Sequence, residues 1–342
     1  MKKLVTIAVP VYKRLDYLVD AIKSVAAQDY PHIELIVSDN GENGSKVREL
    51  VEHWYPRPFR FRQNPRTVPL PQHYNQLIEV ATGDYFAFLD YDDMLSPNYV
   101  SELVRIMEAR PDVAVGLARV EVVDIAGQYL RASSAQIPEF MSGPDFIRAW
   151  TDYGFESYAT VLGRTAYIKE DGGHPNIPGG THTDDAILIK LCLRGSVAIS
   201  QRCSFRWRFS PVSFGWSMKC ASLAEDTRQY LKFVDRDPAL RRYAATEPQQ
   251  WRAIKPHLSR LGWQTYLERW QGMYQEQTPF LQWVRGAFAM PWVPEYYRAV
   301  ASTLRWGLHE RAVRRVKKYW PRTPKANYAH GSGDDSQHRA ES

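Results

Sequence analysis

The sequence contains few cysteines, no long apolar run and no repeated unit. Its three cysteines among 342 residues, Cys192, Cys203 and Cys220, are odd in number and share no metal-ligand spacing. We therefore expect reduced thiols in a cytoplasmic protein rather than a disulfide framework or a zinc site. No apolar stretch approaches the ~20 residues that a membrane-spanning helix needs. No period of ~20–50 residues is evident either, which excludes a solenoid.

The N-terminus lacks the cleavage site of a secretory signal peptide. The stretch MKKLVTIAVPVY begins with two lysines before an apolar run, as such a peptide would. The run is short and rich in β-branched residues, however, and no small-residue cleavage site follows it. We interpret it as a first buried strand.

A strong excess of charge is also absent, because 44 Lys and Arg against 38 Asp and Glu leave a net charge of +6. The basic residues gather in residues 305–325, where Glu310 is the only acid and Trp and Tyr are interleaved. This composition suits an anionic membrane surface or nucleic acid, and we expect the membrane surface rather than nucleic acid. A solvated basic helix face is the open alternative. Residues 323–342 are polar and are expected to be disordered.

The first half of the sequence alternates strand and helix patterns. Short apolar runs predict strands, and apolar residues at helical spacing predict helices between them. The expected strands are residues 4–9, 33–37, 59–61 and 85–89, and the expected helices are residues 15–26, 47–54 and 72–81. This βαβα order predicts a Rossmann-like, mostly parallel sheet flanked by helices. Ligands of such sheets bind beyond the carboxyl ends of the strands.

The second half predicts several further elements and then a helical region. Ser96-Pro97 is a helix-start signal in which Ser96 is the N-cap. The other expected elements are a hairpin of residues 113–123 and 128–132, a strand at residues 159–168 and a helix at residues 184–195. From about residue 215 the strand patterns fade, and we expect an appended helical region.

Three carboxylates, Asp90, Asp92 and Asp93, follow the apolar strand almost side by side. Carboxylates this close repel one another and are costly to desolvate. Asp90 and Asp92 project to the same side of an extended chain. That arrangement suits Mg²⁺, which takes one or two carboxylates and completes its shell with waters and substrate phosphates. A capping role is the structural alternative, but Ser96 is expected to fill it.

Four segments then reveal a resemblance. They are, in chain order, TIAVPVYKR, DAIKSVAAQDYPHIELIVSDNGEN, ATGDYFAFLDYDDMLSPNYV and TDDAILIKLCLRG. Together they resemble the family 2 glycosyltransferases over about residues 4–210. The resemblance implies a GT-A fold at residues 1–215, followed by a mainly helical region at 216–322, basic and aromatic at its end, and the tail at 323–342.

The resemblance implies a nucleotide-binding role for residues after the first two strands. Pro10 and Tyr12 match the segment whose aromatic ring packs on the nucleotide base, although Tyr12 also fits the rim of the core. Asp39 matches the first of the family's paired acids. Asn40 stands where the second acid commonly binds the base of a UDP donor. An amide offers both donors and an acceptor, so UDP stays the expected donor nucleotide, with dTDP, CDP and GDP open. The stretch SDNGEN also fits a plain turn.

The resemblance also implies a metal-bound diphosphate. Asp90-Tyr91-Asp92 matches the family's Asp-x-Asp motif, in which Asp92 is the more direct metal ligand and Asp90 lies nearer the ribose or the metal waters. The cation, Mg²⁺ or Mn²⁺, would bridge the diphosphate of the nucleotide sugar. Arg208 matches a basic residue that approaches the diphosphate.

Asp185 is the expected general base. Thr183-Asp184-Asp185 opens a helix and matches the acidic pair whose second member deprotonates the acceptor hydroxyl. Acids at a helix N-terminus are also favoured by capping and by the helix dipole, but Thr183 or Asp184 can cap. The roles of Asp93 and of two loop histidines, His174 and His182, stay open.

The expected activity is an inverting glycosyl transfer to a hydroxyl of a glycan or lipid-linked acceptor, as in cell-surface polysaccharide synthesis, at the inner face of the membrane. A retaining double displacement would need a second nucleophile, and none is evident. Two alternatives remain. A sugar nucleotidyltransferase is disfavoured because VPVYKRLDY contains no glycine. A non-catalytic carbohydrate- or nucleic-acid-binding protein is the other.

Overall fold

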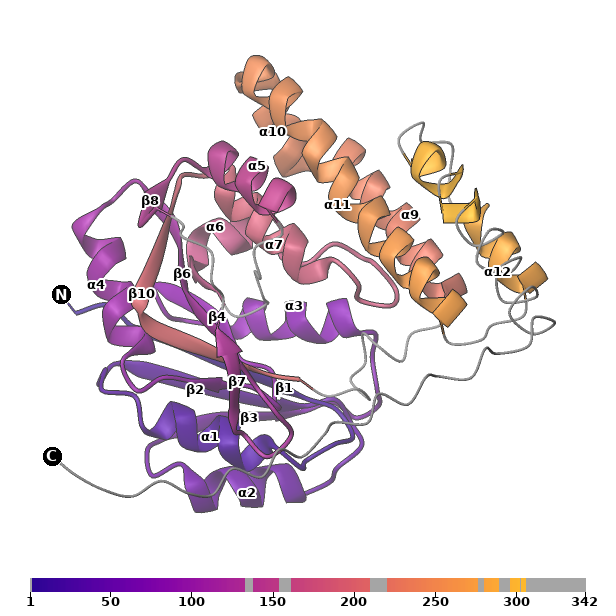
Figure 1. The fold of residues 1–342 in the computed structure, drawn as a ribbon. Coiled ribbons are helices and arrows are strands. Elements are labelled where there is room, and N and C mark those ends of the chain that lie inside the picture. The colour runs from indigo at the N-terminus through magenta and orange to yellow at the C-terminus, as the bar shows by residue number, and fades with distance from the viewer. Residues whose placement is uncertain are drawn as a thin grey trace, which may run out of the picture.

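The fold is built on one mixed sheet with helices on both faces (Figure 1). A computed structural model describes residues 2–132, 138–153, 161–209, 220–275, 280–288, 296–301 and 303–305. The strand order is β3-β2-β1-β4-β9-β6-β10-β5, with β7 paired to β6 and β8 to β10. Strands β3, β2, β1 and β4 are mutually parallel, and β6 is parallel to β10. The short strands β5, β7, β8 and β9 run antiparallel to their neighbours.

The elements have the following bounds. The strands are β1 Val5–Val11, β2 Ile33–Asp39, β3 Phe59–Gln63, β4 Tyr85–Phe88, β5 Met94–Leu95, β6 Val113–Val123, β7 Tyr129–Ala132, β8 Phe140–Met141, β9 Leu162–Arg164 and β10 Ser196–Arg208. The helices are α1 Leu18–Ala26, α2 Lys46–Trp54, α3 Leu70–Val80, α4 Tyr99–Ala109, α5 Gly143–Tyr153, α6 Thr165–Glu170, α7 Thr183–Cys192, α9 Cys220–Arg236, α10 Pro238–Thr246, α11 Pro248–Gln275 and α12 Phe280–Ala287.

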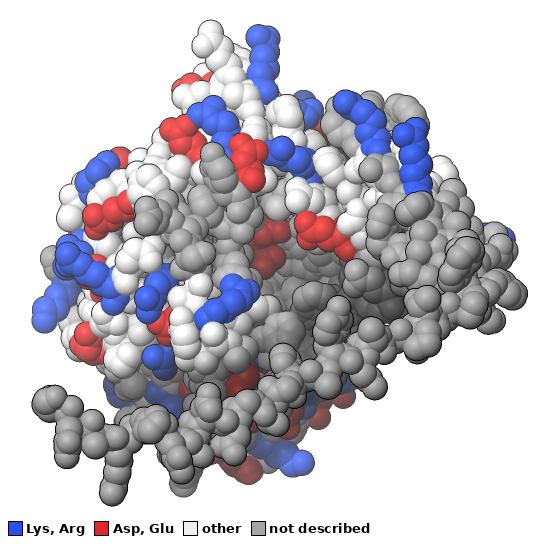
Figure 2. Space-filling view, in the orientation of Figure 1, with Lys and Arg blue, Asp and Glu red and all other residues white. Residues whose placement is uncertain are grey.

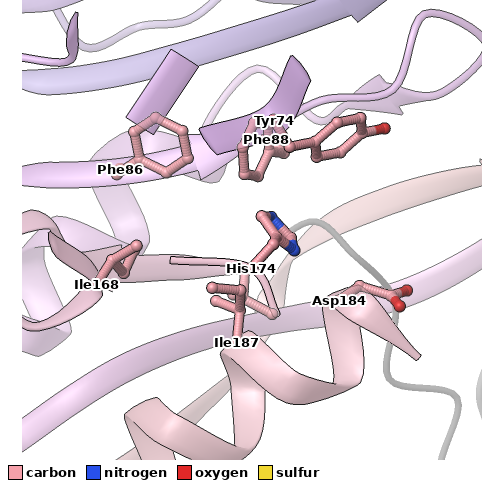
Figure 3. A pocket seen from close by; sticks show the side chains of 8 residues that line it. Tyr74, Phe86, Phe88, Ile168, His174, Asp184 and Ile187 are labelled. Carbon is pink, nitrogen blue, oxygen red and sulfur yellow. The ribbon is translucent and has the colours of Figure 1, made fainter. Parts of the chain in front are cut away.

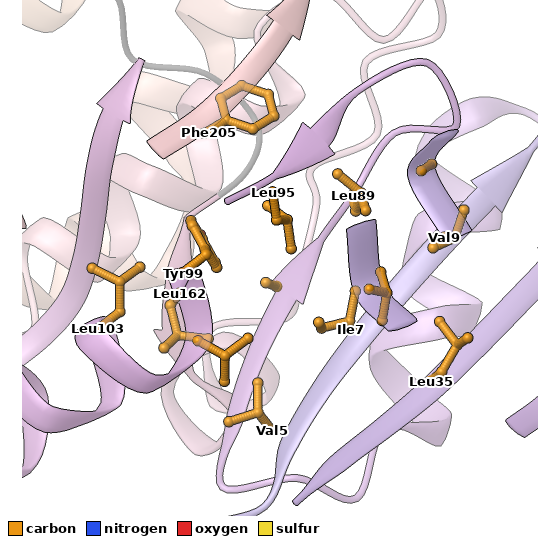
Figure 4. Close-up of a cluster of buried hydrophobic side chains, with 14 of the residues drawn as sticks. Val5, Ile7, Val9, Leu35, Leu89, Leu95, Tyr99, Leu103, Leu162 and Phe205 are labelled. Atoms are coloured by element: carbon orange, nitrogen blue, oxygen red, sulfur yellow. The ribbon is translucent and has the colours of Figure 1, made fainter. Parts of the chain in front are cut away.

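Two apolar clusters cover the two faces of the sheet. Side chains alternate between the faces of a strand, so Val5, Ile7 and Val9 of β1 join the first cluster, whereas Ala8 joins the second. The first cluster adds buried residues of α1, α2 and α4. Figure 4 draws part of this cluster, including Val5 and Ile7 of β1 and Tyr99 and Leu103 of α4. The second adds residues of α3, α5, α6 and α7. Because β1, β2 and β4 are covered on both sides, their sequences read as nearly continuous apolar runs.

The C-terminal helices continue the second cluster. Buried side chains of α9, α10 and α11, among them Tyr230, Leu240 and Leu258, pack in the same cluster as Ala8 of β1 and Phe88 of β4. A third cluster, centred on Trp270, joins α9, α11 and α12. The expected helical extension is confirmed, and α9–α11 are packed onto the sheet's helices rather than separated from them (Figure 1).

Several sequence predictions agree with the structure. The strands and helices expected before residue 90 are confirmed to within a few residues, as are the hairpin β6–β7 and helix α7. Cys192 and Cys203 are buried free thiols, whereas the side chain of Cys220 lies outside the described residues.

Two predictions are wrong, and one strand was missed. Ser96 is not the N-cap of α4, because that helix begins at Tyr99 and Asn98 precedes it; the Ser96 hydroxyl instead accepts from the backbone N–H of Ser204 in β10. The strand expected at residues 159–168 is only three residues long, and its second half is helix α6. Strand β10 was not foreseen at all, since polar residues interrupt its alternation at the irregularity between Ser200 and Ser204.

Gln28 takes over the role expected of Ser96. Its Oε1 accepts from the backbone N–H of Val100, 3.1 Å away, and its Nε2 donates to the carbonyls of Ser24 and Ser96 at 3.0 and 2.8 Å. One buried amide therefore ties the C-terminal end of α1 to the start of α4 and to the chain that leaves the aspartates.

We predict that Gln28→Ala lowers the free energy of unfolding by about 1–3 kcal/mol, because it leaves buried backbone groups unpaired. Thermal unfolding followed by circular dichroism measures this, with the exposed Gln72→Ala as the control. Equal melting temperatures for the two variants would contradict the capping role.

Candidate active site

The carboxyl ends of β1, β2 and β4 meet at one edge of the sheet. Pro10 lies opposite Ser38 and Val11 opposite Asp39, and the backbone N–H of Leu89 donates to the carbonyl of Ala8. This register brings the residues after β1, Asp39 at the end of β2 and Asp90 beyond β4 to the same edge. The predicted nucleotide-binding and metal-binding residues are therefore neighbours, at the position where parallel sheets bind ligands.

Asp90 is held by a tyrosine that the sequence did not single out. The Tyr74 hydroxyl on α3 donates to Asp90 Oδ1 at 2.6 Å. Asp93 is buried and accepts from the backbone N–H of Arg208 at 2.9 Å. Asp92, between them in the sequence, is partly exposed.

The electrostatics of this loop disfavour its full ionisation. Burial and then the charge of Asp90 raise the pKa of Asp92 to about 6. Burial also raises the pKa of Asp90, against the opposing hydrogen bond from Tyr74. The pKa of Asp93 lies well above its usual value because of burial and the charges of its two neighbours. Such a loop favours the binding of a cation.

Arg208 lies beneath the aspartate loop at the end of β10, and it is only 2% exposed. Its Nε donates to the carbonyl of Asp92 at 2.9 Å, its Nη1 donates to the carbonyl of Ile125 at 2.8 Å, and its Nη2 pairs with Asp20 at 2.7 Å. The guanidinium also stacks over the ring of Tyr17. The predicted contact between Arg208 and a diphosphate stays untested, but these bonds commit the guanidinium to protein groups that fix the loop.

Asp39 and Asn40 are both buried and both bonded to protein. Asp39 accepts from the backbone and the side-chain amide of Asn43. The Asn40 Oδ1 accepts from Asn64 Nδ2 and from the backbone N–H of Val68, while its Nδ2 donates to the carbonyl of Val68. Because both lone pairs of the Asn40 oxygen are engaged, this side chain offers a nucleotide base only one remaining N–H.

The two predicted tyrosines differ in exposure. Tyr12 is 42% exposed, with Lys13 Nζ 4.9 Å from its ring centroid. Its face is therefore accessible at the sheet edge, as stacking on a base requires. Tyr91 packs partly against the first apolar cluster, and burial raises the pKa of its hydroxyl to about 12.

Helix α7 supplies the second acidic group of the site. Asp184 and Asp185 occupy its first turn. Burial and then the neighbouring Asp185 carboxylate raise the pKa of Asp184 to about 7. Asp185 pairs with His182 Nδ1, and the Oδ2–Nδ1 distance is 2.8 Å. Neither carboxylate caps the N-terminus of α7, because His182 occupies the N-cap position and no side-chain capping hydrogen bond forms there.

The two acidic groups share one electrostatic environment. Burial raises the pKa of the Tyr74 hydroxyl, and the carboxylates of Asp90 and Asp184 raise it further; the charge of Asp90 also adds to the raised pKa of Asp184. In the space-filling view, acidic side chains lie at the rim of a hollow in the middle of the displayed face (Figure 2). Within the described part of the chain, no three His, Cys, Asp or Glu side chains are grouped closely enough to hold a metal by themselves.

His174 lies behind this edge, between α3, β4 and α7. Its ring stands between the aromatic rings of Tyr74 and Phe88 on one side and the α7 side chains Asp184 and Ile187 on the other (Figure 3). These residues border a cavity of about 20 Å³, enough for one water molecule. Burial lowers the pKa of His174 to about 3, so the ring is neutral and too enclosed to contact an acceptor.

Three supporting residues were missed by sequence reasoning. Tyr74 binds Asp90, Asp20 pairs with Arg208, and Asp226 of α9 binds the loop before α7. Each acts across a long separation along the chain, and none lies in a local motif. The sequence identifies His182 only as a loop histidine. It precedes Asp185 by three residues, and this spacing is the sequence signal for their contact.

The described part of the chain thus combines a mostly parallel α/β sheet with carboxylates at adjoining strand ends, which is the architecture of the GT-A class of nucleotide-sugar enzymes. Residues 6–169 match the model for Glycosyl transferase family 2. The match covers just under half of the chain and identifies a glycosyl transferase family 2 domain in that part.

Two relatives illustrate the sequence similarity. Glycosyltransferase GlyG of Streptococcus pneumoniae is 26% identical over 181 residues, which is 50% of this chain and 58% of the relative. An uncharacterized protein of Sinorhizobium fredii is 33% identical over 115 residues, 33% of this chain and 13% of the relative. The chain therefore covers less than two thirds of the length of these relatives.

Solved structures show the same fold. Staphylococcus aureus TarS 1–349 in complex with UDP-GlcNAc superposes with a TM-score of 0.60 at 16% identity, covering 91% of this chain and 92% of that one. The mannosyltransferase PcManGT from Pyrobaculum calidifontis, in complex with GDP-Man and Mn²⁺, gives 0.54 at 15% identity, covering 90% and 81%.

Some expectations concern residues that the structure does not describe. The basic and aromatic segment 305–325 lies outside the described residues except for Arg305, and so does the tail 323–342. Among the helices within the described ranges, none has the length and apolarity to cross a membrane.

We predict that Asp92→Asn stabilises the metal-free protein at pH 8. The folded-state pKa of Asp92, about 6, lies above its ordinary value of 3.8. Ionisation therefore opposes folding at every pH above about 6, and the penalty disappears below the ordinary pKa. The free energy of unfolding should rise by about 1–3 kcal/mol at pH 8, and the gain should shrink toward pH 4.

Urea unfolding in the presence of EDTA measures this effect. Asp112→Asn is the control of opposite sign, because Arg110 lowers the pKa of Asp112; this variant should bring no gain. A metal-free Asp92→Asn protein that is less stable than the wild type at pH 8 would show that the carboxylate is favourably paired.

Proposed function

We propose that this chain is an inverting glycosyltransferase that uses a metal-bound nucleotide-diphosphate sugar and Asp185 as the general base. One observation carries the proposal. Tyr74 donates to Asp90 and lines the same cavity as Asp184 (Figure 3), so the acids beyond β4 and the acids that open α7 approach one another although about 90 residues separate them. The match to the model for glycosyl transferase family 2 supports the same reaction class.

The donor nucleotide would lie across the ends of β1, β2 and β4. Its base would stack on Tyr12, with Pro10, Asp39 and Asn40 beside it, and its diphosphate would extend toward Asp90 and Asp92. These two carboxylates fit a divalent cation, since burial raises the pKa of both. When bound, Mg²⁺ or Mn²⁺ would neutralise charge that develops on the leaving diphosphate.

The chemistry would be a single displacement. Asp185 accepts the proton of the acceptor hydroxyl, and the acceptor oxygen forms a bond to the anomeric carbon of the sugar. The bond from that carbon to the phosphate oxygen breaks on the opposite face, and its electron pair leaves with the nucleoside diphosphate. Backside attack inverts the anomeric configuration. A positioned base of this kind contributes about 10²–10⁴-fold to the rate.

The identity of the donor depends on the base pocket. TarS has been captured with UDP-GlcNAc and PcManGT with GDP-Man and Mn²⁺. We propose a UDP-sugar for this chain, with dTDP-, CDP- and GDP-sugars as the alternatives. The remaining N–H of Asn40 can donate to a base carbonyl, which uracil, thymine, cytosine and guanine all present. The acceptor would be a hydroxyl of a glycan or of a lipid-linked glycan.

We predict metal-dependent binding and turnover of a nucleotide sugar. A panel of UDP-, dTDP-, CDP- and GDP-sugars should include at least one that raises the melting temperature when Mn²⁺ is present. Asp92→Asn should lose this stabilisation. Asp185→Asn should retain it but release nucleoside diphosphate about 10²–10⁴-fold more slowly.

Asp112→Asn serves as the surface control and should behave as the wild type. The proposal fails if no nucleotide sugar binds with Mn²⁺ or Mg²⁺, or if Asp185→Asn turns over at the wild-type rate. Release of pyrophosphate from a nucleoside triphosphate and a sugar phosphate would instead identify a nucleotidyltransferase. Binding of glycans without any turnover would identify a carbohydrate-binding protein.

We also propose that residues 305–325 dock on an anionic membrane surface at the site of a lipid-linked acceptor. A chain ending at Arg305 retains every described residue. It should keep donor binding but lose sedimentation with vesicles that contain anionic lipid, because each Lys or Arg near such a surface contributes about 1 kcal/mol. Undiminished sedimentation of the shortened chain would exclude this segment as the anchor.

A further inference from the structure

We propose that His182 is a positioning residue for the Asp185 base, and that helix α9 of the C-terminal region holds His182 in place. The inference rests on the proposed function, because it takes Asp185 as the base. It adds a requirement that the base alone does not imply: the C-terminal helices complete the acceptor side of the active site.

The contact between His182 and Asp185 has a defined direction. A general base acts in its ionised form, and an ionised carboxylate only accepts hydrogen bonds. Nδ1 of His182 therefore carries the hydrogen and donates to Asp185 Oδ2 across 2.8 Å. The hydrogen bond fixes one carboxylate oxygen and leaves Oδ1 for an acceptor hydroxyl.

Exposure separates the two roles. The Asp185 side chain is 19% exposed, whereas that of His182 is 2% exposed. An acceptor can therefore reach Asp185 but not His182. The His182 Nε2 is buried and has no hydrogen-bond partner among the described residues. Donation to Asp185 is thus the only polar interaction described for this ring.

The backbone at His182 is held in an uncommon conformation. Its φ is +67°, in the left-handed region, immediately before the first turn of α7. A residue with a β-carbon adopts this region at an energetic cost, which Asn and Gly avoid best. The geometry aims the imidazole back over the helix N-terminus, where Asp185 lies.

Helix α9 provides the support for this geometry. The ring of Tyr230, which is fully buried, lies 4.6 Å from the ring of His182, and its hydroxyl donates to the carbonyl of Leu258 in α11. One turn earlier on α9, Asp226 is 1% exposed and accepts from the backbone N–H groups of Gly179 and Thr181 at 2.8 and 3.1 Å.

The contact between Asp226 and the loop before α7 requires a glycine at Gly179. A β-carbon there would lie 2.4 Å from Asp226 Oδ2, closer than any tolerated contact. Each carboxylate oxygen of Asp226 accepts a hydrogen bond from one backbone N–H of the loop, and the ring of Tyr230 packs against the imidazole of His182. Asp226 and Tyr230 lie on the same face of α9, because residues four apart on a helix are neighbours. This face therefore contacts the loop before α7 at two points, the loop backbone and the ring of His182.

The test compares two substitutions of His182 that both tolerate a positive φ. His182→Asn keeps an amide N–H close to the position of Nδ1, whereas His182→Gly removes the donor without adding backbone strain. We expect His182→Gly to lower kcat about 10–100-fold, as a small displacement of a reacting group does. KM for the nucleotide sugar should change less than about twofold, because the donor binds at the strand ends. His182→Asn should retain at least about a third of kcat.

Two further variants distinguish a loss of positioning at Asp185 from a general loss of structure. In Asp226→Asn, the amide nitrogen replaces one of the two oxygens that accept from the loop backbone. The loop is then held less firmly, so kcat should fall while KM for the nucleotide sugar stays unchanged. His257→Asn is the matched control, because His257 and Asp152 form another His–carboxylate pair, 3.3 Å apart, on α11 and α5; its kcat should equal that of the wild type. Each variant is first checked for wild-type melting and for Mn²⁺-dependent binding of UDP.

A spectroscopic measurement needs no turnover. Long-range ¹H–¹⁵N NMR of the histidine side chains, with His182 assigned from its missing signal in His182→Asn, should show the hydrogen on Nδ1. Hydrogen on Nε2, or a wild-type kcat in His182→Gly, would overturn the inference while leaving the proposed function intact. Failure of wild-type protein to bind any nucleotide sugar would overturn the proposed function, and the NMR result would still decide whether His182 donates to Asp185.

Discussion

The structure depends on a cluster of carboxylates held at the carboxyl edge of a sheet that is buried on both faces. Burial opposes ionisation of Asp90, Asp92 and Asp184, neighbouring carboxylates add to this cost at Asp92 and Asp184, and the pKa of each is raised. A protein tolerates such a cluster where a ligand of opposite charge offsets it. The cation of the proposed metal-bound diphosphate would meet this need at the aspartate loop. The fold places the cluster where parallel sheets bind ligands.

The surrounding elements act mainly to hold these carboxylates. Arg208 ties the aspartate loop to α1 and to the β6–β7 turn through Asp20 and the carbonyl of Ile125. On the other side, α9 binds the loop before α7 through Asp226. The family model ends at residue 169, so α7 and α9 lie beyond it. The proposed acceptor side would therefore lie beyond the part that the family model covers, in keeping with the rule that the fold alone does not fix the substrate.

Much of this arrangement could be predicted from sequence, because the signals were local. Buried strands read as apolar runs, and the acids after β4 stood out against them. The errors arose where a distant partner replaced a local one. Ser96 looked like a cap, but Gln28 caps α4 from the segment that follows α1. Strand β10 lacked alternation because it changes register beside β6. Asn40 looked free to bind a base, yet Asn64 and Val68 engage its oxygen. No local pattern records such contacts.

The most direct test is a crystal structure with UDP and Mn²⁺, in which the anomalous signal of manganese locates the cation. The account predicts a single strong peak between the carboxylates of Asp90 and Asp92 and the diphosphate, with the base against Tyr12. A cation bound elsewhere, or a diphosphate bound away from this edge without contact to Asp92, would contradict it.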